Sequence, residues 1–149
     1  MSYSDTACLV KIYVEETDSE TFREFLRERD QVVTSGEFAR LEFFTPLWRM
    51  EGDGNIAGGS AEAAIALFDK RLTENSCRLI PLDDSVREEF EEVVRRCYSR
   101  HPSIRIRTLD ALHIAAARVA GEDEIVATDK RLRDAATLLG FRLFPTPTP

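Results

Sequence analysis

Short apolar runs alternate along the chain with longer stretches in which hydrophobic residues recur at helical spacing. Phe22, Phe25 and Leu26 lie three and four residues apart, which places them on one face of a helix predicted over 19–29. Similar patterns predict helices over 9–14, 60–75, 84–98, 108–121 and 129–139, and one that is capped by Ser35 or Gly36 and ends near residue 50. Strands are predicted just before residue 5 and over 31–34, 78–82, 124–128 and 141–144.

Short strands separated by helices are typical of a parallel sheet that helices cover on both faces. We therefore predict an α/β fold with three layers in the order α/β/α. The length of 149 residues suits one domain, which we place at 1–145, with 146–149 as a flexible tail. Asp83 and Thr108 are the expected N-caps of two helices. In such sheets, ligands bind beyond the carboxyl ends of the strands.

The charge balance argues at first against nucleic acid as a partner. The chain has 20 Lys and Arg against 27 Asp and Glu, a formal charge of −7, whereas non-specific nucleic-acid binders are usually basic. Its three cysteines lack metal-binding spacing, and with only two histidines a zinc site is not expected. No stretch reaches the roughly 18 apolar residues of a membrane span. No signal peptide is recognisable either, so we expect a cytoplasmic protein.

Four acidic residues stand at or near the carboxyl ends of the predicted strands: Asp5, Glu42, Asp110 and Asp129. Helix capping is the simplest alternative role for an Asp at such a position. It does not account for Glu42, which we place two turns into its helix among hydrophobic neighbours. Asp110 opens a helix that is apolar nearly all round, and a buried acid there requires a partner charge or a metal ion.

Several carboxylates in one pocket repel each other, so either their pKa values rise or a hard cation lies among them. Asp and Glu oxygens without His or Cys favour Mg²⁺ or Mn²⁺. Such an ion activates water for attack on a phosphate and stabilises the charge that develops. One or two divalent ions would also offset part of the formal charge of −7, so the acidity does not exclude a phosphodiester substrate.

Four segments, in order, resemble the PIN-domain ribonucleases and especially the VapC-type toxins of bacterial toxin–antitoxin pairs. The segments are DTACLVKIY at 5–13, VTSGEFARLE at 33–42, TLDALHIAAA at 108–117 and IVATDKRL at 125–132. Each motif alone is weak. The ordered set, however, covers most of the chain and is fairly specific.

The resemblance implies a PIN-like, flavodoxin-like fold and a Mg²⁺- or Mn²⁺-dependent endoribonuclease. Its catalytic and metal-binding residues would be Asp5, Glu42, Asp110 and Asp129, with Thr6 as a supporting hydroxyl. The RNA phosphodiester would be cleaved by metal-activated water.

The resemblance also implies two protein partners. The family is usually a homodimer, and a separate antitoxin protein holds the toxin inactive. We expect the antitoxin to lay an apolar segment against the first two helices, near Tyr13, Phe22 and Phe25.

Three positions depart from the family pattern. Ala7 replaces the usual Ser, and Gly36 stands where a hydroxyl residue is usual, which leaves Ser35 as a supporting residue one place earlier. Pro46 removes the hydrogen bond to the Glu42 carbonyl, so we predict a kink that could shift Glu42. Ala7 and Pro46 keep an alternative open, a catalytically impaired PIN-like module that binds RNA or protein.

A stretch without acids from 93 to 109 carries five arginines: Arg95, Arg96, Arg100, Arg105 and Arg107. It is either a solvated helix end and loop, or an RNA-binding surface that leads to Asp110, because Arg binds phosphate through two hydrogen bonds. His113 lies three residues after Asp110 and could contact it, more as a packed, hydrogen-bonded histidine than as a catalytic base.

Overall fold

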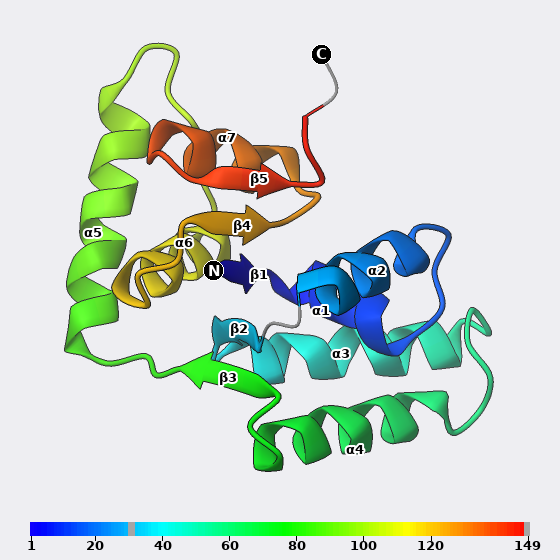
Figure 1. Ribbon diagram of the computed structural model, residues 1–149. Helices are drawn as coiled ribbons and strands as arrows, with labels where there is room; N and C mark the ends of the chain where they lie inside the picture. The colour runs from blue at the N-terminus through cyan, green and yellow to red at the C-terminus, as the bar shows by residue number, and fades with distance from the viewer. Residues whose placement is uncertain (30–31, 148–149) are drawn as a thin grey trace.

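The computed structural model describes residues 1–29 and 32–147. Within this part of the chain, five parallel strands form one sheet in the order β3-β2-β1-β4-β5 (Figure 1). The strands are β1 (Ser2–Ser4), β2 (Val33–Gly36), β3 (Cys77–Ile80), β4 (Glu124–Val126) and β5 (Arg142–Phe144). The helices are α1 (Thr6–Tyr13), α2 (Ser19–Arg29), α3 (Ala39–Gly52), α4 (Ser60–Thr73), α5 (Asp84–Ser99), α6 (Thr108–Val119) and α7 (Lys130–Leu138).

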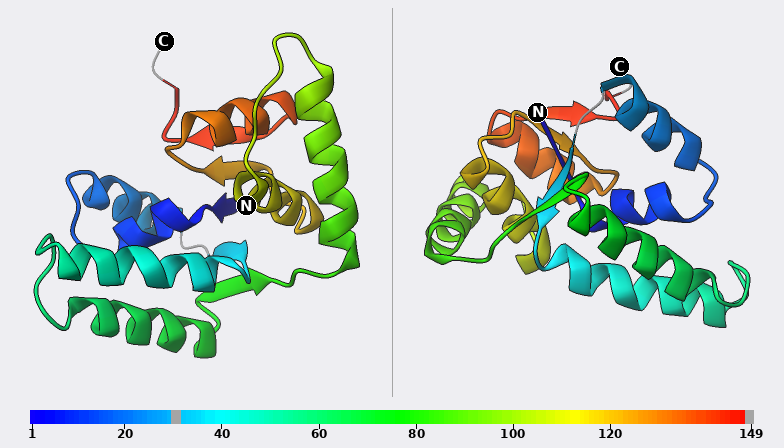
Figure 2. Two further views of the ribbon diagram at one scale, coloured as in Figure 1. Left: turned by 180° about the vertical axis from the view of Figure 1, so that it is seen from behind. Right: turned by 60° about the horizontal axis from the view of Figure 1, so that its bottom comes forward.

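Helices cover both faces of the sheet (Figure 2). Helices α5, α6 and α7 pack on one face, where Tyr3 and Ile125 belong to their apolar cluster. Helices α1, α3 and α4 pack on the other face around Val33 and Phe43. Ile125 and Val126 belong to different clusters because neighbouring residues of a strand point to opposite faces. The predicted three-layer α/β/α sandwich with a central parallel sheet is confirmed.

The second strand lies later in the chain than the sequence predicted. The prediction was 31–34, whose first residue lies outside the described residues, whereas β2 ends at Gly36. Ser35 and Gly36 both pair with β3, so neither caps a helix, and α3 begins only at Ala39. The Ser35 hydroxyl donates instead to the carbonyl oxygen of Ser4, at 2.7 Å. Ser35 therefore ties two strands together, and its predicted capping role was wrong.

Gly36 has no room for a side chain. A Cβ atom at this position would lie 2.3 Å from the Phe38 ring and 2.9 Å from the Tyr3 hydroxyl. Contacts below 3 Å require the neighbours to shift, so the space that a hydroxyl residue would need is already filled. The glycine at position 36, which departs from the family pattern, therefore fits the space that Phe38 and Tyr3 leave.

Aspartates cap three of the helices. Asp5 caps α1, Asp83 caps α5 and Asp129 caps α7, and each accepts hydrogen bonds from backbone N–H groups of the first turn. The prediction of Thr108 as a cap was wrong, because Thr108 is already helical and Arg107 holds the N-cap position of α6. Asp83 was predicted correctly.

Helix α3 continues through Pro46 to Gly52. The proline therefore does not interrupt the helix, and the kink expected at Pro46 stays a prediction. None of the described helices is long and apolar enough to span a membrane. Of the tail predicted at 146–149, residues 148 and 149 lie outside the described residues.

Candidate functional site

The four acidic residues singled out in the sequence lie at the carboxyl end of the sheet. Asp5 follows β1 directly, and Asp129 follows β4 by three residues. Asp110 lies in the first turn of α6 and Glu42 in the first turn of α3. The placement of Glu42 two turns into its helix was wrong, because β2 extends to Gly36 and delays the start of α3.

Glu42 is held by two side chains. The Thr6 hydroxyl donates to its Oε2 at 2.7 Å, and the Nε2 atom of His113 lies 2.9 Å from the same oxygen. Burial raises the pKa of Glu42, but the hydrogen bonds from His113 and Thr6 outweigh this effect and lower the pKa below its usual value. The environment therefore keeps Glu42 ionised and fixed beside the start of α1.

His113 connects Glu42 to Tyr3. Its side chain is buried, and its Nδ1 atom lies 2.9 Å from the Tyr3 hydroxyl. An ionised carboxylate only accepts hydrogen bonds, so the Nε2–H group of His113 donates to Glu42. Burial raises the pKa of Tyr3 above its usual range, which keeps this hydroxyl protonated. The sequence suggested Asp110 as the partner of His113, and Tyr3 was not among its candidates.

Arg107 joins two of the other three acids, Asp110 and Asp129. Its guanidinium donates to both carboxylate oxygens of Asp110, at 2.7 and 3.2 Å, and to Asp129 at 3.1 Å. The Asp110 side chain is only 10% exposed, so this ion pair supplies the partner charge that a buried acid requires. The three-residue spacing of Arg107 and Asp110 was the available signal, but the sequence reading assigned Arg107 to the RNA-binding run.

Asp5 is more buried than the other three acids. Its residue is 4% exposed, and its Oδ1 accepts the backbone N–H of Cys8 at 2.8 Å. Burial raises the pKa of Asp5, and the effects of His113 and the Cys8 N–H offset this only in part. The site at Asp5 thus favours either the protonated acid or a nearby cation.

The donor chemistry at this edge fits a hard divalent ion. The four acids offer carboxylate oxygens, the ligands that Mg²⁺ and Mn²⁺ prefer. In the part of the chain that the structure describes, however, no group of three or more His, Cys, Asp or Glu side chains is arranged to hold a metal ion. Both oxygens of Asp110 are instead engaged by Arg107.

A cavity of about 1040 Å³ opens beside the acids, between α1 and α3. Its lining includes Thr6 and Glu42 of the hydrogen-bonded network and Thr128, which precedes Asp129. Ala7 and Pro46, the departures from the family pattern, line it as well. The cavity is at the upper end of the size range of small-molecule sites, so it has room for part of an extended polymer.

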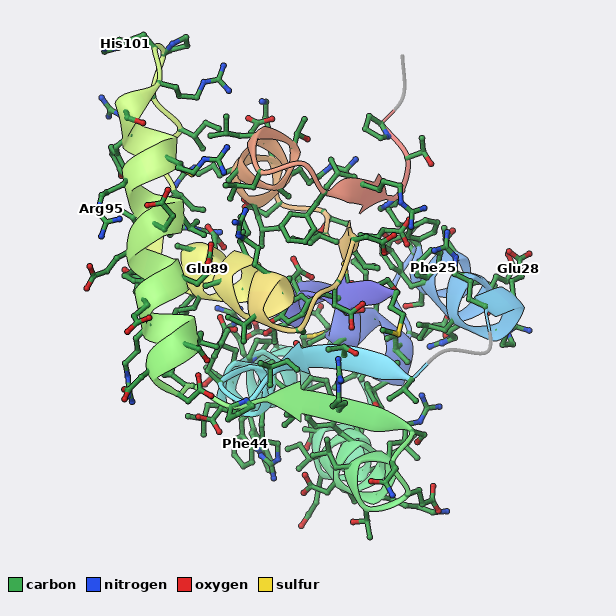
Figure 3. The ribbon with its side chains drawn as sticks, turned by 60° about the vertical axis from the view of Figure 1, so that its left-hand side comes forward. Phe25, Glu28, Phe44, Glu89, Arg95 and His101 are labelled. Carbon is green, nitrogen blue, oxygen red and sulfur yellow. The ribbon has the colours of Figure 1, made fainter. Side chains whose placement is uncertain are left out.

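The structure divides the predicted run of arginines. Arg95 points away from the sheet on the outer side of α5 (Figure 3) and pairs with two glutamates of its own helix. Arg96 lies in the last turn of that helix. Arg100 and Arg105 line a second cavity, of about 570 Å³, together with Arg131 of α7. Arg107 is the member of the run that contacts the acids.

Comparison with known proteins gives consistent matches over nearly the whole chain. A family model described as the PIN domain matches residues 3–138. Ribonuclease VapC46 of Mycobacterium tuberculosis is 32% identical over 143 residues, which cover 93% of this chain and 92% of that protein. Ribonuclease VapC35 of the same organism is 26% identical over 147 residues, which cover 95% and 93%.

Two solved structures have a similar fold. The crystal structure of Mycobacterium tuberculosis VapC20, described as a sarcin-ricin loop cleaving toxin, has a TM-score of 0.67 at 19% identity, covering 91% of this chain and 95% of that one. FitAB bound to the IR36 DNA fragment has a TM-score of 0.67 at 14% identity, covering 97% and 94%. At these identities the likeness shows a shared fold.

Proposed function

Because this chain belongs to the PIN domain family, we propose that it is a divalent-metal-dependent endoribonuclease and the toxin of a toxin–antitoxin pair. The observation that carries the proposal is the gathering of Asp5, Glu42, Asp110 and Asp129 at one edge of the sheet, beside an open cavity. The ribonuclease names of VapC46 and VapC35 support RNA as the substrate.

The four acids have different roles in this proposal. Asp5, Asp110 and Asp129 would hold the ion with Glu42, which Thr6 and His113 keep ionised and oriented. A bound Mg²⁺ or Mn²⁺ would supply Lewis acidity for the attack of water on a phosphodiester. Glu42 borders the cavity, so an RNA strand placed there would bring its backbone next to these oxygens.

The second cavity is proposed to bind phosphates of the RNA strand on the far side of the acids. Arg131 lies two residues after Asp129, and Arg105 lies two residues before Arg107, so this cavity adjoins the site. Arg100 adds a third guanidinium. Such contacts position the backbone without reading its sequence. This narrows the predicted RNA-binding run to Arg100 and Arg105 and adds Arg131.

The antitoxin is proposed to bind a cavity of about 400 Å³ that Tyr13, Ile56 and Leu67 line, next to the larger one. The sequence also suggested Phe22 and Phe25 as contact residues. These two are 2% and 5% exposed and pack against the closing strand β5, so they are unavailable to a partner.

The homodimer is proposed to form through α3. Leu41, Phe44 and Trp48 are 74%, 42% and 45% exposed, and their spacing of three and four residues places them on one face of the helix. Figure 3 shows Phe44 on the outer surface of the molecule.

Light scattering tests both partners. The chain alone should have the mass of two copies, and the chain co-expressed with the product of the neighbouring open reading frame should carry that product as a bound second protein. A monomer that captures no such product would contradict both assignments.

An RNA cleavage assay tests the proposed activity. We expect the wild type to cut RNA with Mn²⁺ and to stop in excess chelator. Asp110→Asn should reduce the rate by about 100-fold or more, because it removes a metal-binding charge. Asp84→Asn is the matched control, since Asp84 also lies in the first turn of a helix but is 92% exposed at α5.

The same assay decides between catalysis and the alternative. A module that only binds RNA is favoured by the placement of Ala7 and Pro46 in the cavity wall. It would bind RNA without cutting it under any metal condition. Cleavage that persists in chelator, or in Asp110→Asn at the wild-type rate, would instead refute the carboxylate mechanism. Loss of cleavage in Asp84→Asn would show that the assay reports stability and not the site.

A further inference from the structure

Arg107 lies among the acidic side chains at the carboxyl edge of the sheet. It contacts two of the four acids directly, Asp110 through both carboxylate oxygens and Asp129 through one. One side chain therefore neutralises part of the charge on two carboxylates.

The two ends of this ion pair differ in their freedom to move. The Asp110 side chain is 10% exposed and belongs to a buried helix, whereas the Arg107 side chain is 57% exposed. Arg107 is also the N-cap residue of α6, where the backbone is extended and precedes the helix. The arginine can therefore move into solvent while Asp110 stays in place.

We propose that Arg107 is an internal cation that competes with the divalent ion for Asp110 and Asp129. The inference rests on the proposed metal-dependent function and adds a state to it. In the metal-free protein Arg107 binds both acids and occupies the carboxylate oxygens that the divalent ion would need. Metal binding displaces Arg107 toward solvent.

Electrostatics makes the two states mutually exclusive. A guanidinium and a divalent ion that share the oxygens of Asp110 would lie only a few ångströms apart, and like charges at that distance repel strongly in a partly buried site. Asp110 has a counter-charge in either state, so the buried acid is never left unpaired. The affinity of the site for metal is consequently set by the difference between the free energy with which the acids bind the divalent ion and that with which they bind Arg107.

Isothermal titration with Mn²⁺ alone, without RNA, tests this competition. Arg107→Gln should bind Mn²⁺ about tenfold more tightly than the wild type, because the internal competitor is gone. Arg107→Lys keeps the charge but loses the bidentate contact with Asp110, so its affinity for Mn²⁺ should lie between those of the wild type and Arg107→Gln. Lys130→Gln is the matched control. Lys130 is the residue after Asp129, but it is 86% exposed and pairs with Asp134, so its loss should change the affinity by less than about twofold.

The melting temperature in chelator provides a second readout. Arg107→Gln should melt below the wild type without metal and regain the difference when Mn²⁺ is added. Equal or weaker Mn²⁺ binding by Arg107→Gln and Arg107→Lys would overturn the competition and leave the ribonuclease proposal standing. An equal gain in Lys130→Gln would overturn it as well, since overall charge would then explain the effect. Failure of the wild type to bind Mn²⁺ would overturn the metal-dependent function itself.

Discussion

Asp5→Asn is expected to produce a protein that is more stable than the wild type in chelator yet has lost about 10³-fold of its ribonuclease activity. Asn caps a helix about as well as Asp, so the bond from the Cys8 N–H is retained. Burial raises the pKa of the Asp5 carboxyl, which means that its charged form is unfavourable in the folded protein. The substitution removes this charge. We expect a gain of about 1 kcal/mol, or about 2–4 °C in melting temperature, together with loss of the Mn²⁺-induced stabilisation.

Asp83→Asn is the matched control for this prediction. Asp83 caps α5 as Asp5 caps α1, but its hydrogen bonds from Ser85 and the Val86 N–H lower its pKa. A lowered pKa contributes stability that is present at neutral pH and is lost as the pH falls, so Asp83→Asn should destabilise. For Asp5 the sign is opposite, because a raised pKa gives stability at low pH that is lost as the pH rises.

Two results would contradict the prediction for Asp5. The first is an Asp5→Asn protein that melts below the wild type in chelator at neutral pH, since the buried charge would then not be unfavourable. The second is a variant that still cleaves RNA at the wild-type rate, which would remove Asp5 from the site.

His113→Ala is expected to have the largest effect on stability, about 3 kcal/mol. The change opens a cavity in the core, removes the partner of the buried Tyr3 hydroxyl and takes a donor from Glu42. The melting temperature should fall by about 6–12 °C for a domain of this size. Chemical denaturation of both proteins in chelator measures the difference without any contribution from metal.

The second histidine of the chain serves as the control. His101 is exposed beyond the end of α5 (Figure 3), so His101→Ala should leave stability within about 0.5 kcal/mol of the wild type. His113→Gln retains part of the hydrogen bonding and should recover part of the loss. A change below about 1 kcal/mol in His113→Ala would mean that the network linking β1, α3 and α6 is not a structural unit.

The layered fold was predictable because it depends on local periodicity. Apolar runs and helical spacing repeat along the chain, and the short loops leave few ways to arrange the elements. The start of α3 was not predictable in the same way. Ser35 and Gly36 pair with β3, and their capping preference is overridden by contacts with residues more than 40 positions away. Tertiary pairing therefore moved the start of α3 two or three residues beyond the position that local propensity favours.

The acids of the candidate site were visible in the sequence, but their partners were only partly so. The predicted burial of Asp110 indicated that a counter-charge lies beside it. Arg107, only three residues away in the sequence, supplies that charge. The network of Tyr3, His113 and Glu42 joins residues that are 110 and 71 positions apart. No spacing rule signals such contacts. Amphipathicity also failed to show which partner a helix face meets, and Phe25 stacks on Phe144 within the chain instead of binding another protein.

The acids at the carboxyl edge of the sheet are proposed to hold a divalent ion together. Anomalous diffraction from crystals of the wild type soaked in Mn²⁺ would locate this ion. We expect a Mn²⁺ peak within coordination distance of carboxylate oxygens of Asp5 and Asp110, with the Arg107 guanidinium moved off Asp110. A crystal that shows no Mn²⁺ peak among these acids, while Arg107 still binds Asp110 and Asp129, would contradict this proposal.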